Sequence, residues 1–205
     1  MVDVVVPPER LERWVTNFGE RHGGVTTDVV AGRLTGAGGD GSTFTAVLPF
    51  GRTHAGAADV DAFRAAAAPP KTWGVLLVRK GGFAVARLAG PRVVASKVGR
   101  RHVQGRSKAG GQSQQRFARR RDNQARSAYD AATDHAVVVL GEPALPLVVG
   151  GDRTAVAAVL EDRRLARHTV VEPWLPVPEP RRGELDAAVV TASSVRIDVV
   201  NAPGT

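Results

Sequence analysis

The chain has 205 residues, enough for one or two domains with a buried core, and a formal net charge of +8 at pH 7. It contains no cysteine, which excludes disulfides, zinc–thiolate sites and thiol nucleophiles. Because we find no signal-peptide pattern and no apolar run long enough to span a membrane, we expect a cytoplasmic protein without membrane contact.

The first 70 residues predict a small α+β unit that ends at Pro69 and Pro70. Apolar residues that recur every three or four positions predict helices, and β-branched runs between glycines predict strands. The expected elements are a helix over 7–22, strands over 25–36 and 42–50, and a short helix over 59–68. No residue pattern in this unit points to a chemistry, so its role stays open.

Residues 71–205 predict a second, α/β domain. Gly81 and Gly82 are typical of a tight hairpin turn, and a third strand after it makes an antiparallel meander. The expected elements are strands over 73–80, 83–89, 92–99, 145–151, 168–172 and 195–200, and helices over 112–140, 152–165 and 182–193. Alternation of strands and helices after a meander predicts a mixed sheet with flanking helices.

Positive charge is concentrated in one stretch. Ten of the 28 Lys and Arg residues lie between Lys97 and Arg126, where the only acid is Asp122, and elsewhere basic and acidic residues nearly balance. Local basicity favours a specific contact with a polyanion such as RNA. A solvated, charged helix face is the alternative interpretation, because the run 119–121 cannot all point one way.

Gly110, Gly111 and Gln112 stand between this basic loop and the predicted helix. Two glycines let the main chain approach a ligand closely, and unpaired N–H groups at a helix start favour developing negative charge. Such donors suit the oxyanion of an ester under attack by water. The Gln side chain can position a water but cannot act as a general base. A Gly/Ser-rich linker is the alternative interpretation of the same residues.

The stretch from Gly105 to Arg119, GRSKAGGQSQQRFAR, resembles part of the middle domain of eukaryotic and archaeal class-I peptide-chain release factors. There the catalytic loop and the following helix read GRGGQS, two variable residues, then RFAR. The resemblance covers roughly residues 72–171. We find no counterpart of the stop-codon-reading domain, so the chain looks more like the release-factor-like peptidyl-tRNA hydrolases of the VLRF family, which has an actinobacterial branch.

That resemblance implies an RNase H-like α/β fold and hydrolysis of the ester between a stalled nascent peptide and its tRNA. The implied partners are peptidyl-tRNA and the rRNA of the peptidyl-transferase centre on the large ribosomal subunit, with no cofactor and no protein metal. Gly110, Gly111 and Gln112 are the expected catalytic residues, and we expect a monomer because ribosomal entry is narrow. The expected RNA-binding residues are Arg100, Arg101, Arg106, Lys108, Ser113, Arg116, Arg119, Arg120 and Arg121.

Two other functions stay open. A non-catalytic RNA- or ribosome-binding module would use the charge alone and would show strong salt dependence. An endonuclease that cuts the tRNA 3′ end would need several carboxylates converging on metal ions. Asp122, Asp130 and Asp134 have only loosely helical spacing, and the histidines show no ligand spacing, so we expect no metal site.

Overall fold

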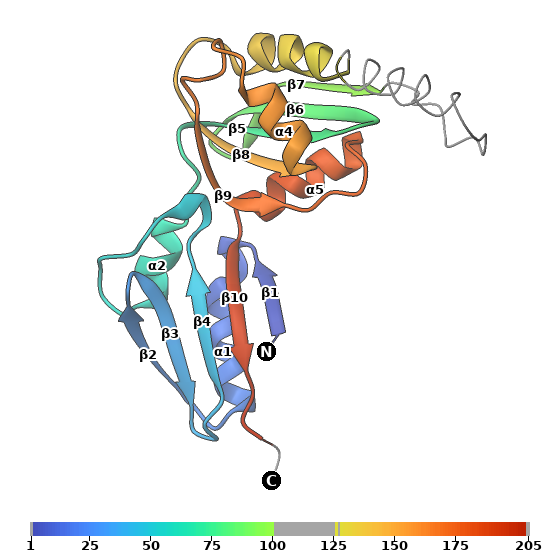
Figure 1. Ribbon diagram of the computed structural model, residues 1–205. Coiled ribbons are helices and arrows are strands. Elements are labelled where there is room, and N and C mark those ends of the chain that lie inside the picture. The colour runs from blue at the N-terminus through green and yellow to red at the C-terminus, as the bar shows by residue number, and fades with distance from the viewer. Residues whose placement is uncertain (1, 101–125, 127, 204–205) are drawn as a thin grey trace, which may run out of the picture. The chain divides into compact units, whose positions relative to one another are not determined.

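Two five-stranded sheets organise the chain (Figure 1). The computed structural model describes residues 2–100, 126 and 128–203. The described residues belong to two units: one comprises Met1–Pro69 together with Val189–Thr205, and the other is Pro70–Ala188. Within the described part of the chain, no helix is both long and apolar enough to cross a membrane.

The sheet of the first unit is antiparallel throughout, in the order β1-β10-β4-β3-β2. Its strands are β1 (Val2–Val6), β2 (Val25–Val30), β3 (Arg33–Gly38), β4 (Thr43–Val47) and β10 (Val195–Val200). The helices of this unit are η1 (Pro8–Arg10), α1 (Leu11–Arg21), η2 (Pro49–Gly51) and α2 (Val60–Ala66). Asp59 caps α2 by accepting a hydrogen bond from the Ala62 N–H at 2.8 Å.

The last strand, β10, corrects the expected assignment of residues 71–205 to one domain. Figure 1 shows β10 between β1 and β4, and its Ile197 pairs with Val4 on one side and Ala46 on the other. Val195, Ile197 and Val199 are buried in the core of the first unit. A strand in this position has both edges hydrogen-bonded and one apolar face covered, which no local sequence pattern specifies.

The expected single strand over 25–36 is wrong, because the chain turns back in its middle. β2 and β3 form a hairpin closed by Ala31 and Gly32, whose φ angles are 49° and 73°. A two-residue hairpin turn of this kind needs positive φ at both positions. Glycine adopts such angles readily and alanine rarely does, so Ala31 gave no turn signal. The strand β1 was also not expected.

The core of the first unit lies between α1, α2 and one face of the sheet. Leu11, Val15 and Phe18 recur along one side of α1 and are buried there. They belong to one cluster with Phe44 of β4 and Phe63 of α2. The α+β character expected for this part of the chain is therefore present, with the C-terminal strand added to it.

Asp40 organises the loop between β3 and β4. Its carboxylate accepts hydrogen bonds from the Ser42 N–H at 2.8 Å and the Ser42 hydroxyl at 3.2 Å, and it contacts His22 Nδ1 at 2.8 Å. The hydrogen bond to His22, followed by those to Ser42, lowers the pKa of Asp40 from 3.8 to about 2. The ionised carboxylate thus stabilises the folded state above pH 3.8, and that contribution is lost as the pH falls towards 2.

We therefore expect Asp40→Asn to lower the urea midpoint at neutral pH and to flatten its dependence on pH between about 4 and about 2. Tryptophan fluorescence during urea unfolding measures both. His22→Ala should remove part of the same pH dependence, and the double variant should lose less than the sum of the two. A pH profile of Asp40→Asn parallel to that of the wild type would contradict this assignment.

The second unit carries a mixed sheet in the order β7-β6-β5-β8-β9. Its strands are β5 (Thr72–Arg79), β6 (Gly82–Ala89), β7 (Arg92–Arg100), β8 (Pro146–Gly151) and β9 (Thr169–Leu175). β5, β6 and β7 form the expected antiparallel meander, whereas β8 is parallel to β5 and β9 to β8. The described helices are 128–140, α4 (Arg153–Leu160) and α5 (Arg182–Ala192). The predicted fold class, an α/β mixed sheet with flanking helices after a small α+β unit, is confirmed.

Helices cover both faces of this second sheet. On one face, Leu76 and Val85 share a core cluster with Ala136 of the helix 128–140 and Val156 of α4. Arg182 of α5 lies on the opposite face, where its Nη1 donates to Ser96 Oγ at 2.9 Å. The central strand β5 is consequently buried from residue 73 to residue 78. This explains why its sequence is a continuous apolar run rather than an alternating one.

Candidate functional site

Most of the expected site lies outside the described residues. This holds for Gly110, Gly111 and Gln112, the residues expected to be catalytic. It holds also for Arg101, Arg106, Lys108, Ser113, Arg116, Arg119, Arg120 and Arg121 among the expected RNA-binding residues. Arg100 is described and exposed at the end of β7. The structure thus supplies the two ends of segment 101–125, namely the end of β7 and the helix 128–140.

A glycine shapes the end of β7. Gly99 pairs with Phe83 of β6, and a Cβ added at Gly99 would lie 2.2 Å from Phe83 Cε1. The Phe83 ring therefore occupies space that any side chain at position 99 would need. The same ring stacks on His135 of the helix 128–140, with centroids 5.3 Å apart and planes 24° from parallel. Gly99 thereby lets one aromatic ring connect the strand that enters the segment with the helix that follows it.

The helix 128–140 is held against the sheet by small residues. Ala128, Ala132 and Ala136 recur every four positions and are buried. Leu140, at the end of the helix, is also buried on this face. A Cβ added at Gly74 of β5 would lie 2.6 Å from Leu140 Cδ2. Alanines on the helix and a glycine on the strand allow this close approach, so packing holds the helix in place next to the segment.

Cationic side chains gather at the end of the sheet where β7 finishes. Gly82 pairs with Arg100, the exposed Arg79 ends β5, and the exposed Lys80 lies in the two-residue turn between Arg79 and Gly82. The Arg79 Nη1 donates to the Val177 carbonyl at 2.8 Å, which leaves the rest of its guanidinium available. Lys80 and Arg100 thus lie at one sheet end together with the start of segment 101–125.

Asp152 lies at the same end of the sheet and caps α4. It follows β8 and accepts hydrogen bonds from the Thr154 N–H at 2.9 Å and the Ala155 N–H at 3.4 Å. Burial works against its ionisation, but these hydrogen bonds and the positive charge of Lys80 lower the pKa of Asp152. Burial, and then the charge of Asp152, raise the pKa of Tyr129 at the start of the helix 128–140.

Sequence reasoning missed Lys80, Tyr129 and Asp152 as neighbours. Each stands on a different element, and their spacing along the chain matches no motif. The parallel pairing of β5 with β8 is what brings their carboxyl ends to one edge, with Val78 next to Gly151. Only a correct prediction that β5 pairs with β8 would have shown that these three residues lie close together.

The carboxylates considered for a nuclease do not converge in the described structure. Asp134 forms an ion pair with Arg164 at 2.9 Å, and Arg164 also binds Asp162. Asp130 is exposed, and Asp122 lies outside the described residues. Among the side chains that the structure describes, no group of three His, Cys, Asp or Glu is placed to hold a metal ion.

Comparison with known proteins identifies the family of the chain. A family model described as the actinobacteria/chloroflexi VLRF1 release factor matches residues 71–198. A search of curated proteins finds no match. The matched span contains β7, the helix 128–140 and every residue between them, and it exceeds half of the chain. The chain therefore belongs to the actinobacteria/chloroflexi VLRF1 release factor family.

Proposed function

We propose that this chain is a codon-independent peptidyl-tRNA hydrolase, which releases nascent peptides from stalled ribosomes or large subunits in the cytoplasm. The observation that carries the proposal is the sequence GGQSQQRFAR at 110–119, inside the span that a release factor family model matches. Membership of that family supports a role in translation. Residues 1–70 do not resemble a codon-reading domain, which supports rescue rather than termination at a stop codon.

In the proposed reaction, water adds to the carbonyl carbon of the ester that joins the peptide to the terminal ribose of the tRNA. The Gln112 side chain positions the water, and the backbone N–H at Gln112 donates to the oxyanion. The ester C–O bond then breaks, and the ribose oxygen takes up a proton. The products are a peptide with a free carboxyl group and a tRNA with an intact 3′ hydroxyl.

The charge at the described sheet end supports entry into an RNA cavity. Lys80 and Arg100 lie beside the start of segment 101–125, whose sequence adds seven further Lys and Arg residues. Such a concentration of cations is attracted to rRNA phosphates and positions the segment without reading a base sequence. A monomer fits the narrow approach to the peptidyl-transferase centre best.

The deciding experiment uses the full chain and large subunits that carry a labelled nascent peptide on tRNA. Peptide release together with a tRNA of full length supports ester hydrolysis. A shortened tRNA on a denaturing gel would identify an endonuclease instead. Binding to the subunit without any release would identify a non-catalytic module.

Replacing both Lys80 and Arg100 by alanine should weaken binding to large subunits and reduce its salt dependence. The slope of log K against log salt should fall by about 0.9 for each phosphate that the variant no longer neutralises. The matched control is Lys71→Ala with Arg92→Ala, which removes one exposed Lys and one exposed Arg from the opposite end of the same sheet. Equal slopes for the two double variants would contradict an RNA contact at this end.

A further inference from the structure

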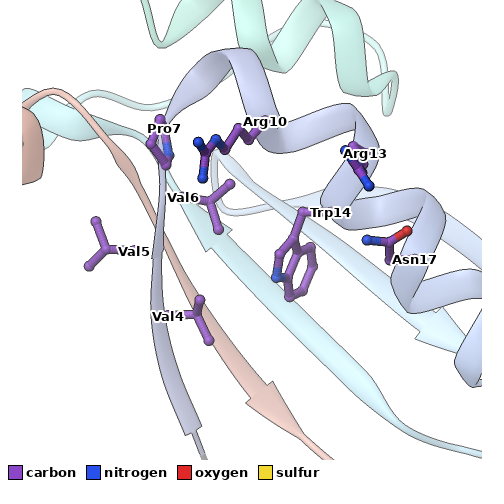
Figure 2. A pocket seen from close by; sticks show the side chains of 8 residues that line it. All are labelled: Val4, Val5, Val6, Pro7, Arg10, Arg13, Trp14 and Asn17. Atoms are coloured by element: carbon purple, nitrogen blue, oxygen red, sulfur yellow. The ribbon is translucent and has the colours of Figure 1, made fainter.

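A groove of about 580 Å³ runs between β1 and α1 in the first unit (Figure 2). Its lining residues are Val4, Val5, Val6, Pro7, Arg10, Arg13, Trp14 and Asn17. Arg13 and Trp14 are adjacent, and Arg10 and Asn17 lie three or four residues from each of them, so all four lie along one side of α1 and of the turn that leads into it. All of these residues belong to the unit for which the sequence disclosed no chemistry.

The floor of the groove is apolar and rigidly supported. Trp14 is partly exposed and points from α1 towards the sheet in Figure 2. Its ring stacks on Phe18 with centroids 5.8 Å apart and meets Phe44 edge-on at 5.2 Å. Val4 is half-buried beside it, and Val6 is buried. An indole held in this way offers apolar contact area with little loss of side-chain entropy on binding.

The rim of the groove is cationic. Arg10 and Arg13 are both exposed, and in the described part of the chain neither guanidinium makes a hydrogen bond or an ion pair. No acidic side chain lines the groove. Asn17 adds an amide that can donate and accept. Two unpaired cations above an apolar floor favour a ligand that carries carboxylates as well as apolar side chains.

The main-chain edge of β1 forms the third wall. β1 pairs with β10 and is the end strand of its sheet, so within residues 2–100, 126 and 128–203 its other edge has no strand partner. Val4, Val5 and Val6 all line the groove although their side chains alternate between faces, which places the groove along this edge. Val2 and Val5 are 54% and 45% exposed, and the strand carries one charge, Asp3. Such an edge is poorly protected against pairing with another strand.

We infer that this groove binds an extended, acidic peptide segment of a partner protein, which adds a strand to β1. The segment's main chain pairs with the free edge of β1, its apolar side chains alternate onto Trp14 and Val4, and its carboxylates meet Arg10 and Arg13. An RNA strand has no N–H and C=O ladder to match a strand edge. A second copy of this groove would bring four like charges together, so a second copy fits less well.

The test is selection from displayed random dodecapeptides on the immobilised full chain. We expect enriched peptides that combine acidic residues with apolar residues at alternate positions. Arg10→Glu with Arg13→Glu should weaken their binding by at least about tenfold. A carboxylate near the start of α1 is compatible with the helix dipole, so this variant should fold. Arg21→Glu with Arg33→Glu makes the same charge change at exposed positions outside the groove and should alter affinity by less than about twofold.

Amide hydrogen exchange of β1 supplies a second readout. Binding of a selected peptide should protect alternate amides of Val2–Val6, because only alternate residues face the free edge. The inference is overturned if enriched peptides lack acidic residues, if the groove variant binds them unchanged, or if β1 exchange is unaffected. Displacement of the peptide by single-stranded RNA, or sedimentation of the wild type as a dimer that the peptide dissociates, would assign the groove to another ligand.

Discussion

Alanine at position 110 or 111 should slow nascent-chain release by a factor on the order of 10²–10³. Gly110 and Gly111 are the two glycines ahead of Gln112, and each is expected to adopt backbone conformations that alanine disfavours. Substitution would turn the N–H of Gln112 away from the oxyanion while leaving the cationic residues in place. Gln112→Ala keeps that N–H and loses only the group that positions water, so its effect should be smaller. Release of a labelled peptide from isolated large subunits measures all three rates.

Gln115→Ala is the matched control, because it removes the same side chain three residues further on, at a position that varies in the resembling pattern. It should release peptide at the wild-type rate. Binding of all four variants to large subunits should be unchanged, which separates chemistry from recruitment. Wild-type release by the Gly110, Gly111 and Gln112 variants would disprove the assignment of this tripeptide as the catalytic group.

The largest effect on stability is expected for Gly150→Ala in β8. A Cβ added at Gly150 would lie 2.2 Å from the Leu175 carbonyl oxygen and 2.6 Å from Leu175 Cβ. Gly150 pairs with Leu175 where the register between β8 and β9 shifts, so the two backbones approach closely there. Relief of the clash would require β9 to move off β8. We expect a loss of about 3 kcal/mol or more in the free energy of unfolding, measured by urea titration.

Gly183→Ala is the control for this substitution. Gly183 lies in the first turn of α5, and a Cβ there would meet no atom within 4 Å. Alanine in an exposed helical position should stabilise by up to about 1 kcal/mol relative to glycine. The two changes are chemically identical, so their opposite signs would locate the cost of Gly150→Ala in the contact with Leu175. A loss of similar size in both variants would contradict that explanation.

Local patterns predicted the three strands of the meander, because glycines mark its turns and apolar runs mark its strands, but the first turn is formed by Lys80 and Gly81 rather than by Gly81 and Gly82. They failed where the structure depends on distant partners or on unusual backbone angles. Ala31 adopts a positive φ in the turn between β2 and β3. The position of β10 is set by its pairing with β1 and β4, which are distant in the sequence. β9 continues through Pro173 to Leu175, beyond the end of the strand expected over 168–172. It is the end strand of its sheet, and a missing N–H on an outer edge leaves no neighbour unpaired.

In the candidate site, too, local features could be predicted from the sequence and features that depend on distant residues could not. The tripeptide at 110–112 was predicted from adjacent residues and from a resemblance, and its role stays a prediction. Lys80 and Asp152 are far apart in the chain and meet only because β5 and β8 run parallel. The groove beside Trp14 was equally hidden, since β1 was not expected and its edge is a property of the sheet order.

The position of β10 has a consequence for dissecting the protein. The release-factor unit is inserted into the first unit, since the chain leaves that unit after Pro69 and returns to it at Val189. A fragment starting at residue 71 would therefore contain β10 without its partner strands β1 and β4. The side chains of Val195, Ile197 and Val199, which are buried in the first unit, would be exposed to solvent. Deleting the N-terminal 70 residues would consequently yield an aggregation-prone protein rather than a stable second unit. Because Val189 lies inside α5, a fragment of the second unit should run from residue 70 to the end of that helix at residue 192.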